Sequence, residues 1–555
     1  MTEKCSVLFC AFFIVCIQNV SSLKIASVTW DKDSNKFSLH KGIVSGYVAK
    51  GAFRNEINTT GWSYLNVSTV QRFPNEIQAY AAGMVEGALT SSLINMTWHN
   101  TIKGYCEKPY SQYCTKLRNF LQQNINWIKA QKDRTDDYWS MVKAFMVQVE
   151  GLEAGYKYHQ SGVIPGISGD INPFGLYMLQ VGGDLEDLEA ALGKKDAKRV
   201  RGSGSCSALI KLLPGNKDLY VSHDTWNSYQ SMIRVLKKYS LQYKTKAGVT
   251  VPGHTMTFSS YPGSLMSGDD YYLISSGLVS LETTIGNSNP ALWISVKPTD
   301  SVMEGIRTMV SNYLAEDGNS WAESFTQFNS GTYNNQWMIV DYKKFVPGAS
   351  NMTKVLYVVE QIPGMMAVGD MTNTILKQSY WPSYNIPYYP QIFNMSGGNE
   401  NVKKFGDWFS YDGSPRAKIF KRDHSKVIDL KSMISLMRYN DYTHDPLSVC
   451  NCTPPYSAEN AISARCDLNP ANGTYPFGAL GHRSHGGTDM KLTNSAMFKK
   501  LQFVAISGPT YDQLPPFQWS KADFRDSAPH IGQPDVFKFD PIMFDGTTDF
   551  KPFQR

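Results

Sequence analysis

A cysteine stands at the start of a strand-like apolar run, directly after a flexible run of glycine and serine. Residues 202–205 form a turn-like segment, and Cys206 opens the apolar run 206–212. In this arrangement the Cys206 thiol can attack the Ser205 carbonyl, take over the acyl group, and be freed by hydrolysis as a new N-terminal residue. The freed α-amine has an ordinary pKa of about 7.7–8.0, so it can accept the thiol proton during turnover. The segment therefore predicts an N-terminal-nucleophile hydrolase that cleaves itself between Ser205 and Cys206.

A histidine on the next strand-like run can lie beside that thiol. Residues 213–217 carry the turn signal Pro-Gly-Asn between the runs 206–212 and 218–226, which predicts a hairpin that brings His223 near Cys206. An imidazole next to a thiol can activate it. A cysteine without a partner is also among the residues most often buried, so the competing interpretation of Cys206 is a small core residue.

The elements that must position this hairpin divide into a helix-rich part before Cys206 and a strand-rich part after it. Helix-rich and strand-rich regions in one undivided chain predict an α+β layered fold. Apolar residues recur at helical spacing over 75–89, 117–130, 138–156, 175–181, 185–192 and, after the hairpin, 228–239. Strand-like runs occupy 24–30, 46–49, 255–260, 271–275, 278–284, 337–342 and 355–360.

Residues 193–205, between the two parts, are basic, contain glycine and include almost no core-forming side chains. They predict an exposed loop, which is either a solvated linker or the end of a propeptide that covers the site until cleavage. No repeat, low-complexity block or Pro/Ser-rich linker divides the chain. We therefore expect one structural body made of an N-terminal fragment, 23–205, and a C-terminal fragment, 206–555.

The first 22 residues have the features of a signal peptide that is removed: a basic residue, an apolar run over 7–16 and small residues at the end. No later run approaches the roughly eighteen consecutive apolar residues that a membrane-spanning helix needs. The sequence therefore predicts a protein of the secretory pathway without a transmembrane segment.

Few cysteines remain after the signal peptide, which argues for an ordinary hydrophobic core with disulfides as local staples. Cys106 and Cys114 bracket a short loop and form the favoured pair. The second disulfide joins Cys450 to either Cys452 or Cys466, and the sequence leaves that choice open.

Seven Asn-X-Ser/Thr sequons occur in the chain, and their density after a signal peptide predicts glycosylation of most of them. Each used site must lie on the surface. The asparagines are Asn58, Asn66, Asn95, Asn351, Asn394, Asn451 and Asn472.

Charge and motifs exclude several functional classes. With 54 Lys and Arg against 48 Asp and Glu, the formal charge is +6, and the basic residues do not gather into a stripe, so no nucleic-acid partner is expected. A serine-lipase elbow Gly-X-Ser-X-Gly is absent from the sequence. His482, His485 and Cys466 are too loosely arranged to indicate a zinc site, and no metal or organic cofactor is predicted.

Several motifs in consistent order resemble the phospholipase B-like family, over almost the whole chain after the signal peptide. Two further segments, 225–230 and 462–470, resemble its lysosomal branch. The six motifs are Cys-Ser-Ala-Leu-Ile-Lys at 206–211, Phe-Ser-Ser-Tyr-Pro-Gly at 258–263, Asn-Ser-Gly-Thr-Tyr-Asn-Asn-Gln at 329–336, Tyr-Trp-Pro-Ser-Tyr-Asn at 380–385, Pro-Arg-Ala-Lys-Ile-Phe at 415–420 and Met-Arg-Tyr-Asn at 437–440.

The resemblance implies a four-layer αββα sandwich of the N-terminal-nucleophile type, in which the two cleavage fragments stay associated. It also implies an asparagine and an arginine around the thiol, and the motifs offer Asn385 for the oxyanion and Arg416 for the thiolate or an anionic group. Asn335 and Arg438 are the fallback candidates from neighbouring motifs. Each of the four is otherwise a structural hydrogen-bond partner.

The predicted function is hydrolysis of acyl ester or amide bonds in lipids, in the lysosome lumen, through a thioester on Cys206. The substrate is a lipid or a small acylated molecule. Two alternatives stay open: an amidase that acts on N-acyl lipids or peptides, and a luminal protein that cleaves itself once and never turns over.

Overall fold

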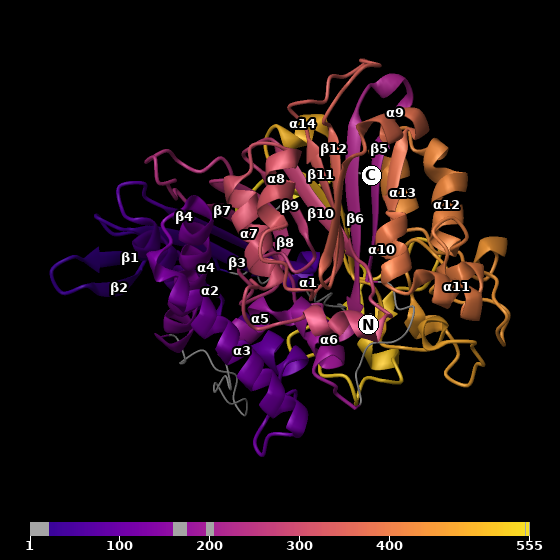
Figure 1. Cartoon of the computed structure of the whole chain (residues 1–555), viewed down its shortest axis with the longest axis horizontal. Helices are drawn as coiled ribbons and strands as arrows, with labels where there is room; N and C mark the ends of the chain where they lie inside the picture. The colour runs from indigo at the N-terminus through magenta and orange to yellow at the C-terminus, as the bar shows by residue number, and fades with distance from the viewer. Residues whose placement is uncertain (1–21, 159–174, 196–204, 550, 554–555) are drawn as a thin grey trace, which may run out of the picture.

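The structure is a computed structural model that describes residues 22–158, 175–195, 205–549 and 551–553. The predicted signal peptide, except residue 22, and most of the loop 193–205 lie outside these residues. Two large β-sheets dominate the described part, and helices surround them (Figure 1). The chain is thus of mixed α/β class, as predicted.

One sheet has eleven strands, and it draws on the chain both before and after Cys206. All neighbouring strands are antiparallel except β4 and β7, which run parallel and join the two parts of the chain. In spatial order the strands are β13 (Met365–Asp370), β12 (Leu356–Ile362), β11 (Asn335–Asp341), β10 (Leu278–Thr284), β9 (Tyr271–Ile274), β8 (Thr255–Ser260), β7 (Val235–Ser240), β4 (Trp62–Thr69), β3 (Ala49–Glu56), β1 (Lys24–Asp31) and β2 (Lys36–Lys41).

The other sheet has eight strands and is built from the C-terminal part alone. Its second and third strands are the hairpin that begins at Cys206. The strand order is β14 (Tyr380–Ser383), β5 (Cys206–Leu212), β6 (Leu219–Ser228), β16 (Asp489–Thr493), β17 (Phe503–Ser507), β20 (Ile542–Phe544) and β21 (Lys551–Pro552), while β15 (His485–Gly487) pairs with the end of β6.

Three hydrophobic cores lie between successive layers. The first joins the outer face of the eleven-stranded sheet to α2 (Asn75–Thr101), α3 (Gln112–Ala130), α4 (Asp137–Tyr158), α7 (Glu304–Leu314) and α8 (Gly318–Phe325). The second lies between the inner faces of the two sheets. The third joins the outer face of the eight-stranded sheet to α12 (Pro415–Asp423) and α13 (Leu430–Met437). Helices thus cover both outer faces of a pair of sheets (Figure 1).

The predicted hairpin is confirmed in every pair of its register. Cys206 lies opposite Thr225, Ala208 opposite His223, and Leu212 opposite Leu219. The Pro-Gly-Asn segment forms a short 3-10 turn at the end of the hairpin. Because directly opposite residues share a face of the sheet, the Cys206, Thr225 and His223 side chains all point toward the other sheet.

The helix predicted over 228–239 is wrong. This stretch contains the end of β6, a 3-10 turn at Tyr229–Ser231, and then β7. β7 is a central strand whose Val235, Leu236 and Tyr239 are all buried, on both faces of the sheet. β7 has the sequence Val-Leu-Lys-Lys-Tyr-Ser and is buried on both faces, so it lacks the alternation of apolar and polar residues that marks a strand.

The long predicted helices are confirmed, and two of them cross at unusually close range. The runs 75–89 and 138–156 lie inside α2 and α4, which pack against each other. At the crossing, the Cα atoms of four glycines lie against the backbone of the opposite helix: Gly83 and Gly87 on α2, and Gly151 and Gly155 on α4. A Cβ added to any of them would lie 2.0–2.1 Å from a carbonyl oxygen. Glycine is therefore required at these positions because any larger side chain would collide with the facing backbone, although glycine has a low helix propensity.

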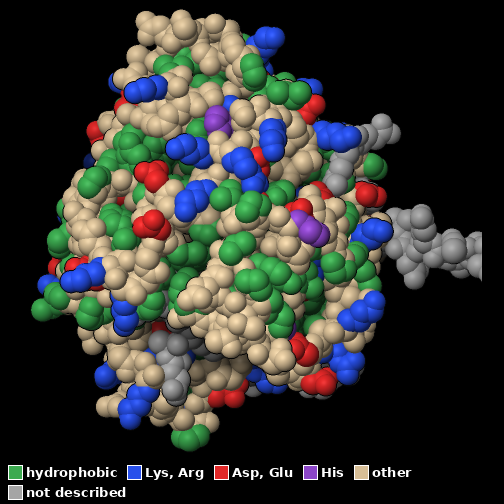
Figure 2. Space-filling model, turned by 90° about the vertical axis from the view of Figure 1, so that its right-hand side faces the viewer, with side chains coloured by type: hydrophobic (Ala, Val, Ile, Leu, Met, Phe, Trp, Pro, Cys, Tyr) green, Lys and Arg blue, Asp and Glu red, His purple; other side chains and the backbone are tan. Residues whose placement is uncertain are grey.

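The structure contains the disulfides Cys106–Cys114 and Cys450–Cys452, and Cys466 is a buried free cysteine. None of the described helices is both long and apolar enough to span a membrane. On the face shown in Figure 2, basic and acidic side chains are interspersed among uncharged and hydrophobic ones, which agrees with the modest net charge.

One predicted glycosylation site does not fit the folded protein. Asn95 lies inside α2 with 1% of its surface exposed, and it accepts a hydrogen bond from Tyr156 of α4 at 3.4 Å. A glycan cannot be accommodated there, so Asn95 is removed from the predicted set. Asn66 is half-buried, and the remaining five sequon asparagines are exposed: Asn58, Asn351, Asn394, Asn451 and Asn472.

The helix crossing generates a test of the fold. Gly83→Ala places a methyl group about 2.0 Å from the Gln148 carbonyl oxygen, so we expect a loss of about 1–3 kcal/mol in the free energy of unfolding. Chemical denaturation of the purified protein measures it. Gly182→Ala is the control, because nothing lies within 4 Å of the added methyl group. Equal stability of the two variants would show that the helices do not cross this closely.

Candidate active site

The peptide bond between Ser205 and Cys206 is held by hydrogen bonds on both sides. The Ser205 carbonyl oxygen accepts a bond of 2.6 Å from the backbone N–H of Trp226. The backbone N–H groups of Ser205 and Cys206 point at Asn385 Oδ1, at 3.1 and 3.5 Å. Arg416 Nη1 donates to the Cys206 carbonyl oxygen at 2.6 Å. The structure thus brings together Cys206, Asn385 and Arg416, three of the residues predicted from the sequence.

Asn385 reaches this bond from the loop that follows strand β14. Its φ of 67° lies in the left-handed region, which asparagine tolerates better than most residues. Its amide nitrogen donates to the Thr284 carbonyl oxygen at 2.7 Å, so its amide oxygen faces the scissile bond. As placed, Asn385 accepts from the scissile nitrogen instead of donating to an oxyanion.

Arg416 comes from the first turn of α12, which Ser414 caps. Its guanidinium lies 4.3 Å from the centre of the Trp226 ring and donates to Asn385 Oδ1 at 2.8 Å. Burial lowers the pKa of Arg416 to about 10, so the group stays cationic at neutral and acid pH. Arg416 therefore connects the loop of Asn385 to the strand of Cys206.

The backbone N–H of Trp226 is a functional group that the sequence analysis did not identify. It bonds the Ser205 carbonyl oxygen, where negative charge develops when a thiol attacks that carbonyl. Counting along the hairpin would have found it: with Cys206 opposite Thr225, the residue opposite Ser205 is Trp226.

His223 lies on the same face as Cys206 but does not bond to it. Its Nε2 lies 2.9 Å from the Glu282 carbonyl oxygen, and its Nδ1 lies 3.4 Å from Thr225 Oγ1. A carbonyl only accepts, so Nε2 carries the proton and Nδ1 accepts from Thr225. Burial lowers the pKa of His223 well below its ordinary value, and the Lys491 charge lowers it further. The imidazole is therefore neutral.

The thiol of Cys206 is buried and neutral in the uncleaved chain. Burial raises its pKa well above the ordinary value, and the nearby Glu282 carboxyl raises it further, whereas the Lys491 ammonium opposes the rise. The uncleaved thiol therefore needs a proton acceptor during attack.

The fallback candidates are engaged elsewhere. Asn335, the first residue of β11, donates to Glu304 of α7 at 3.1 Å. Arg438 donates to the Gly508 and Pro509 carbonyl oxygens at 3.2 and 3.3 Å. Neither is brought to Cys206, so both are structural residues.

Two cavities meet at Ser205. The larger, of about 670 Å³, is lined by Cys206, Thr225 and Trp226 together with Tyr261 and Tyr333. The smaller, of about 270 Å³, is lined by several polar and aromatic residues: Asn385, Arg416, Tyr384, Trp408, Phe409 and Glu459. Small-molecule sites have volumes of roughly 300–1,000 Å³, so the larger cavity is of suitable size for a substrate.

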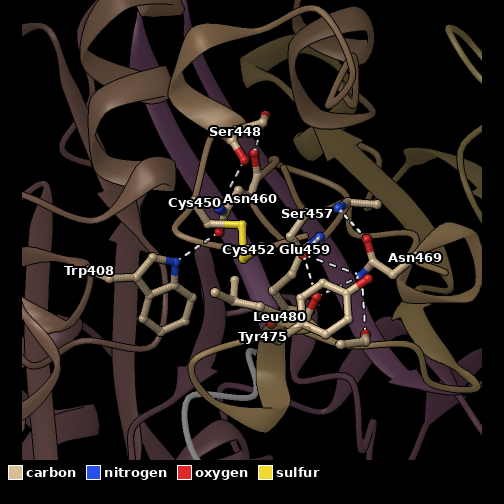
Figure 3. Close-up of a disulfide and its surroundings, with 12 residues drawn as sticks. Trp408, Ser448, Cys450, Cys452, Ser457, Glu459, Asn460, Asn469, Tyr475 and Leu480 are labelled. Atoms are coloured by element: carbon tan, nitrogen blue, oxygen red, sulfur yellow. Dashed lines mark hydrogen bonds between the residues drawn. A yellow bond between two sulfur atoms is a disulfide. The ribbon is translucent and has the colours of Figure 1, made fainter. Parts of the chain in front are cut away.

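The Cys450–Cys452 disulfide staples the segment that leads to the smaller cavity. Figure 3 shows Glu459 and Asn460 beyond this disulfide, with the Trp408 indole donating to Asn460 at 2.8 Å. Ser448, two residues before the disulfide, donates to the Asn460 carbonyl oxygen at 2.7 Å and accepts from the Asn460 amide at 3.2 Å, which holds one wall of the smaller cavity.

Among the described residues, Glu459, Cys466 and His485 offer ligand atoms within 4.8 Å of one another. A guanidinium already occupies this cluster, because Arg483 donates to Glu459 at 3.0 Å and contacts the Cys466 sulfur at 3.5 Å. His482, named with them from the sequence, pairs with Asp523 instead. The set fits an ion pair with a buried thiol better than a metal ion.

Comparisons with known proteins show the family of the chain. The sequence model of the family described as "Phospholipase B" matches residues 49–544. "Putative phospholipase B-like 2" of Bos taurus is 52% identical over 526 residues, which cover 93% of this chain and 89% of that protein. "Putative phospholipase B-like 1" of Caenorhabditis elegans is 45% identical over 507 residues, 90% of this chain and 87% of that protein. "Phospholipase B-like protein B" of Dictyostelium discoideum is 36% identical over 536 residues, 94% of this chain and 90% of that protein. The chain therefore belongs to the phospholipase B family.

Proposed function

We propose that this chain is the precursor of an N-terminal-nucleophile hydrolase that cleaves itself between Ser205 and Cys206. The thiol sulfur bonds to the Ser205 carbonyl carbon, the carbon–nitrogen bond to Cys206 breaks, and the proton passes to that nitrogen. Water then hydrolyses the thioester, which leaves a carboxylate on Ser205 and a free thiol and α-amine on Cys206. In turnover the same thiol takes an acyl group from a substrate and passes it to water.

The single observation that carries this proposal is the set of groups around the scissile bond. The Trp226 N–H lies on the carbonyl oxygen that becomes an oxyanion, and Asn385 Oδ1 lies on the nitrogen that becomes the leaving amine. Arg416 holds two of these groups in place by donating hydrogen bonds to the Cys206 carbonyl oxygen and to Asn385 Oδ1. The Trp226 bond continues the ladder of the hairpin, but a buried core cysteine would not need the Asn385 and Arg416 contacts.

The two fragments would stay associated after cleavage, because they share the eleven-stranded sheet. Strands β1 to β4 come from the N-terminal fragment, and β4 pairs with β7 of the C-terminal fragment over Ser63–Ser68 and Val235–Ser240. Helices α2 and α4 also pack in the same core as α7 and α8. With helices on both faces of the paired sheets, the arrangement supports the αββα sandwich of the N-terminal-nucleophile type.

We assign acyl esters or amides of lipids as the substrates. The names of the relatives, phospholipase B-like proteins, support lipids, and the cavity of about 670 Å³ at Cys206 can hold an acyl chain. Both bond types follow from the same thioester chemistry, so a direct comparison of ester and amide substrates decides between them.

An acidic compartment, the lysosome lumen, is the proposed site of action. Burial raises the pKa of Asp184 to about 6 and that of Glu360 to about 7. In acid these carboxyls are protonated and neutral, so the fold does not have to bury their charges. Exposed sequons such as Asn351 and Asn394 fit a glycosylated protein of the secretory pathway.

Cys206→Ala should abolish self-cleavage and turnover, because no sulfur remains to attack the carbonyl. N-terminal sequencing of the chains after incubation at acid pH measures cleavage, and release of fatty acid from ester and amide lipids measures turnover. Cys466→Ala is the matched control, since it removes the other buried free cysteine. Cleavage before residue 206 in Cys206→Ala would refute the mechanism, whereas cleavage without turnover in the wild type would indicate a non-enzymatic protein.

Asn385→Gly should slow self-cleavage by about 10–150-fold, because it removes a hydrogen bond of about 1.5–3 kcal/mol to the nitrogen that becomes the charged leaving amine. Glycine accepts the φ of 67° without strain, so the substitution removes the side chain and keeps the loop. The rate of fragment appearance on a denaturing gel measures it. Asn335→Gly, in the same chain but away from Cys206, should leave the rate unchanged.

Asp184→Asn should make the protein more stable than the wild type at neutral pH but not in strong acid. The pKa of Asp184 is raised in the folded state, so its contribution to stability is full below about pH 4 and is lost as the pH rises through about 6. Denaturation between pH 4 and 7.5 measures the difference. Asp133→Asn, at an exposed position, is the control. A difference that does not grow with pH would contradict the assignment.

A further inference from the structure

A network of fully buried charges lies between the two sheets beside the nucleophile. Arg234 Nη2 donates to Asp269 and, at 2.7 Å, to Asp489. Asp489 also accepts from Lys491 Nζ, at 2.7 and 2.9 Å to its two oxygens. All four side chains have 0% exposure. Burying four charges costs desolvation free energy, and none of the four takes part in the proposed cleavage.

One end of this network reaches the residue opposite the nucleophile. Lys491 Nζ donates to Thr225 Oγ1 at 2.6 Å, and Lys491 lies opposite His223 in the register of β16 and β6. The backbone N–H of Thr225 donates to Asp489 and not to Cys206. Thr225 and Cys206 therefore form a non-hydrogen-bonded pair of the antiparallel ladder, with no backbone hydrogen bonds between them. Such pairs have the closest side chains in an antiparallel ladder, with Cβ atoms about 4.5–5.5 Å apart.

The hydrogen bonds run in one direction from the lysine. Lys491 can only donate, so Thr225 Oγ1 accepts from it and turns its own proton toward His223 Nδ1. His223 in turn donates through Nε2 to the Glu282 carbonyl oxygen. The histidine is therefore fixed as a neutral donor by these hydrogen bonds, and the Lys491 ammonium contacts Thr225, the residue opposite Cys206.

We propose that Lys491 is a positioning residue whose buried positive charge, one side chain away from Cys206, keeps the freed α-amine unprotonated in acid so that it can serve as the base. This inference rests on the proposed function and adds the device that lets an α-amine work in acid. An α-amine of ordinary pKa would be unprotonated in only about one molecule in a thousand at pH 5. Burial and a fixed nearby cation both disfavour the protonated amine.

Arg416, which donates to the Cys206 carbonyl oxygen at 2.6 Å, is a second cation beside the freed amine and acts in the same direction as Lys491. Burial raises the pKa of Glu282 well above its ordinary value, so this carboxyl is neutral in acid. Burial opposes ionisation of Asp489, but Lys491 and Arg234 outweigh it and hold its pKa below the ordinary value, so the pair stays charged. The titratable and charged groups that face this region are His223, Arg234, Asp269, Asp270, Glu282, Arg416, Arg483, His485, Asp489 and Lys491, with Tyr261 and Tyr333.

The test is the pH profile of turnover, measured on the purified cleaved protein with a fluorogenic acyl substrate. Lys491→Met should move the acid limb of the profile upward by about one pH unit, so the rate at pH 5 falls about tenfold while the rate at pH 7.5 changes less than about twofold. Lys491→Arg, which keeps the charge, should restore the profile of the wild type.

Lys237→Met is the matched control. Lys237 is also a fully buried lysine in an ion pair, 2.7 Å from Glu86. It lies on the outer face of the eleven-stranded sheet, under the helices and away from Cys206. Its loss should lower stability without moving the acid limb. If Lys491→Met does not fold, the double variant Lys491→Met/Asp489→Asn also removes the unpaired carboxylate. It should show a smaller upward shift, because loss of the Asp489 charge by itself favours the unprotonated amine.

Two outcomes overturn the inference, and they differ from failure of the proposed function. An acid limb that stays in place in Lys491→Met, or that moves equally in Lys237→Met, removes the specific role of Lys491 while cleavage and turnover persist in the wild type. A wild type that neither cleaves before Cys206 nor turns over any acyl substrate overturns the proposed function itself.

Discussion

The pairing of Cys206 with Thr225 across two strands is the constraint on which the site depends. It places the first residue of β5 in a pair without hydrogen bonds, so the backbone groups of Cys206 point outward, to Asn385 and Arg416. The adjacent pair, Ser205 with Trp226, supplies the bond to the scissile carbonyl oxygen. A shift of the register by one residue would turn the thiol to the other face of the sheet and remove all of these contacts.

The space between the two sheets determines the electrostatics of the site. It excludes water, so each charge there acts over a longer range than it would at the surface. Carboxyls without a cation, such as Glu282, become neutral, whereas Asp489 keeps its charge between Lys491 and Arg234. The same burial that keeps the thiol of Cys206 neutral strengthens the interactions of any charge held beside it, such as that of Lys491.

The two parts of the chain, before and after Cys206, share one sheet. In the proposed cleavage, a chain cut between Ser205 and Cys206 would keep β4 paired with β7, and the glycine crossing of α2 and α4 would keep the helical layer in place. Hydrolysis of this one peptide bond would therefore free an N-terminus without releasing a fragment. The membership of the phospholipase B family extends over both parts, which agrees with a single body.

The sequence by itself determined the local structure of the site. The turn signal and the two apolar runs predicted the hairpin, helical spacing predicted α2, α3 and α4, and several ordered motifs predicted the family. These features depend on residues close together in the chain. The stretch 228–239 and Asn95 failed because burial on every side erases the pattern that separates strand from helix or surface from core.

Only the tertiary structure decided which distant residues meet at the nucleophile. Asn385 and Arg416 were named from family motifs, but the direction of the amide, with its oxygen toward the scissile nitrogen, follows from the Thr284 carbonyl that holds its other end. Lys491 carries no motif at all. It lies more than 250 residues from Thr225 along the chain, and only the pairing of β16 with β6 brings its charge to the site, because sheet registers between distant strands depend on packing and not on local sequence.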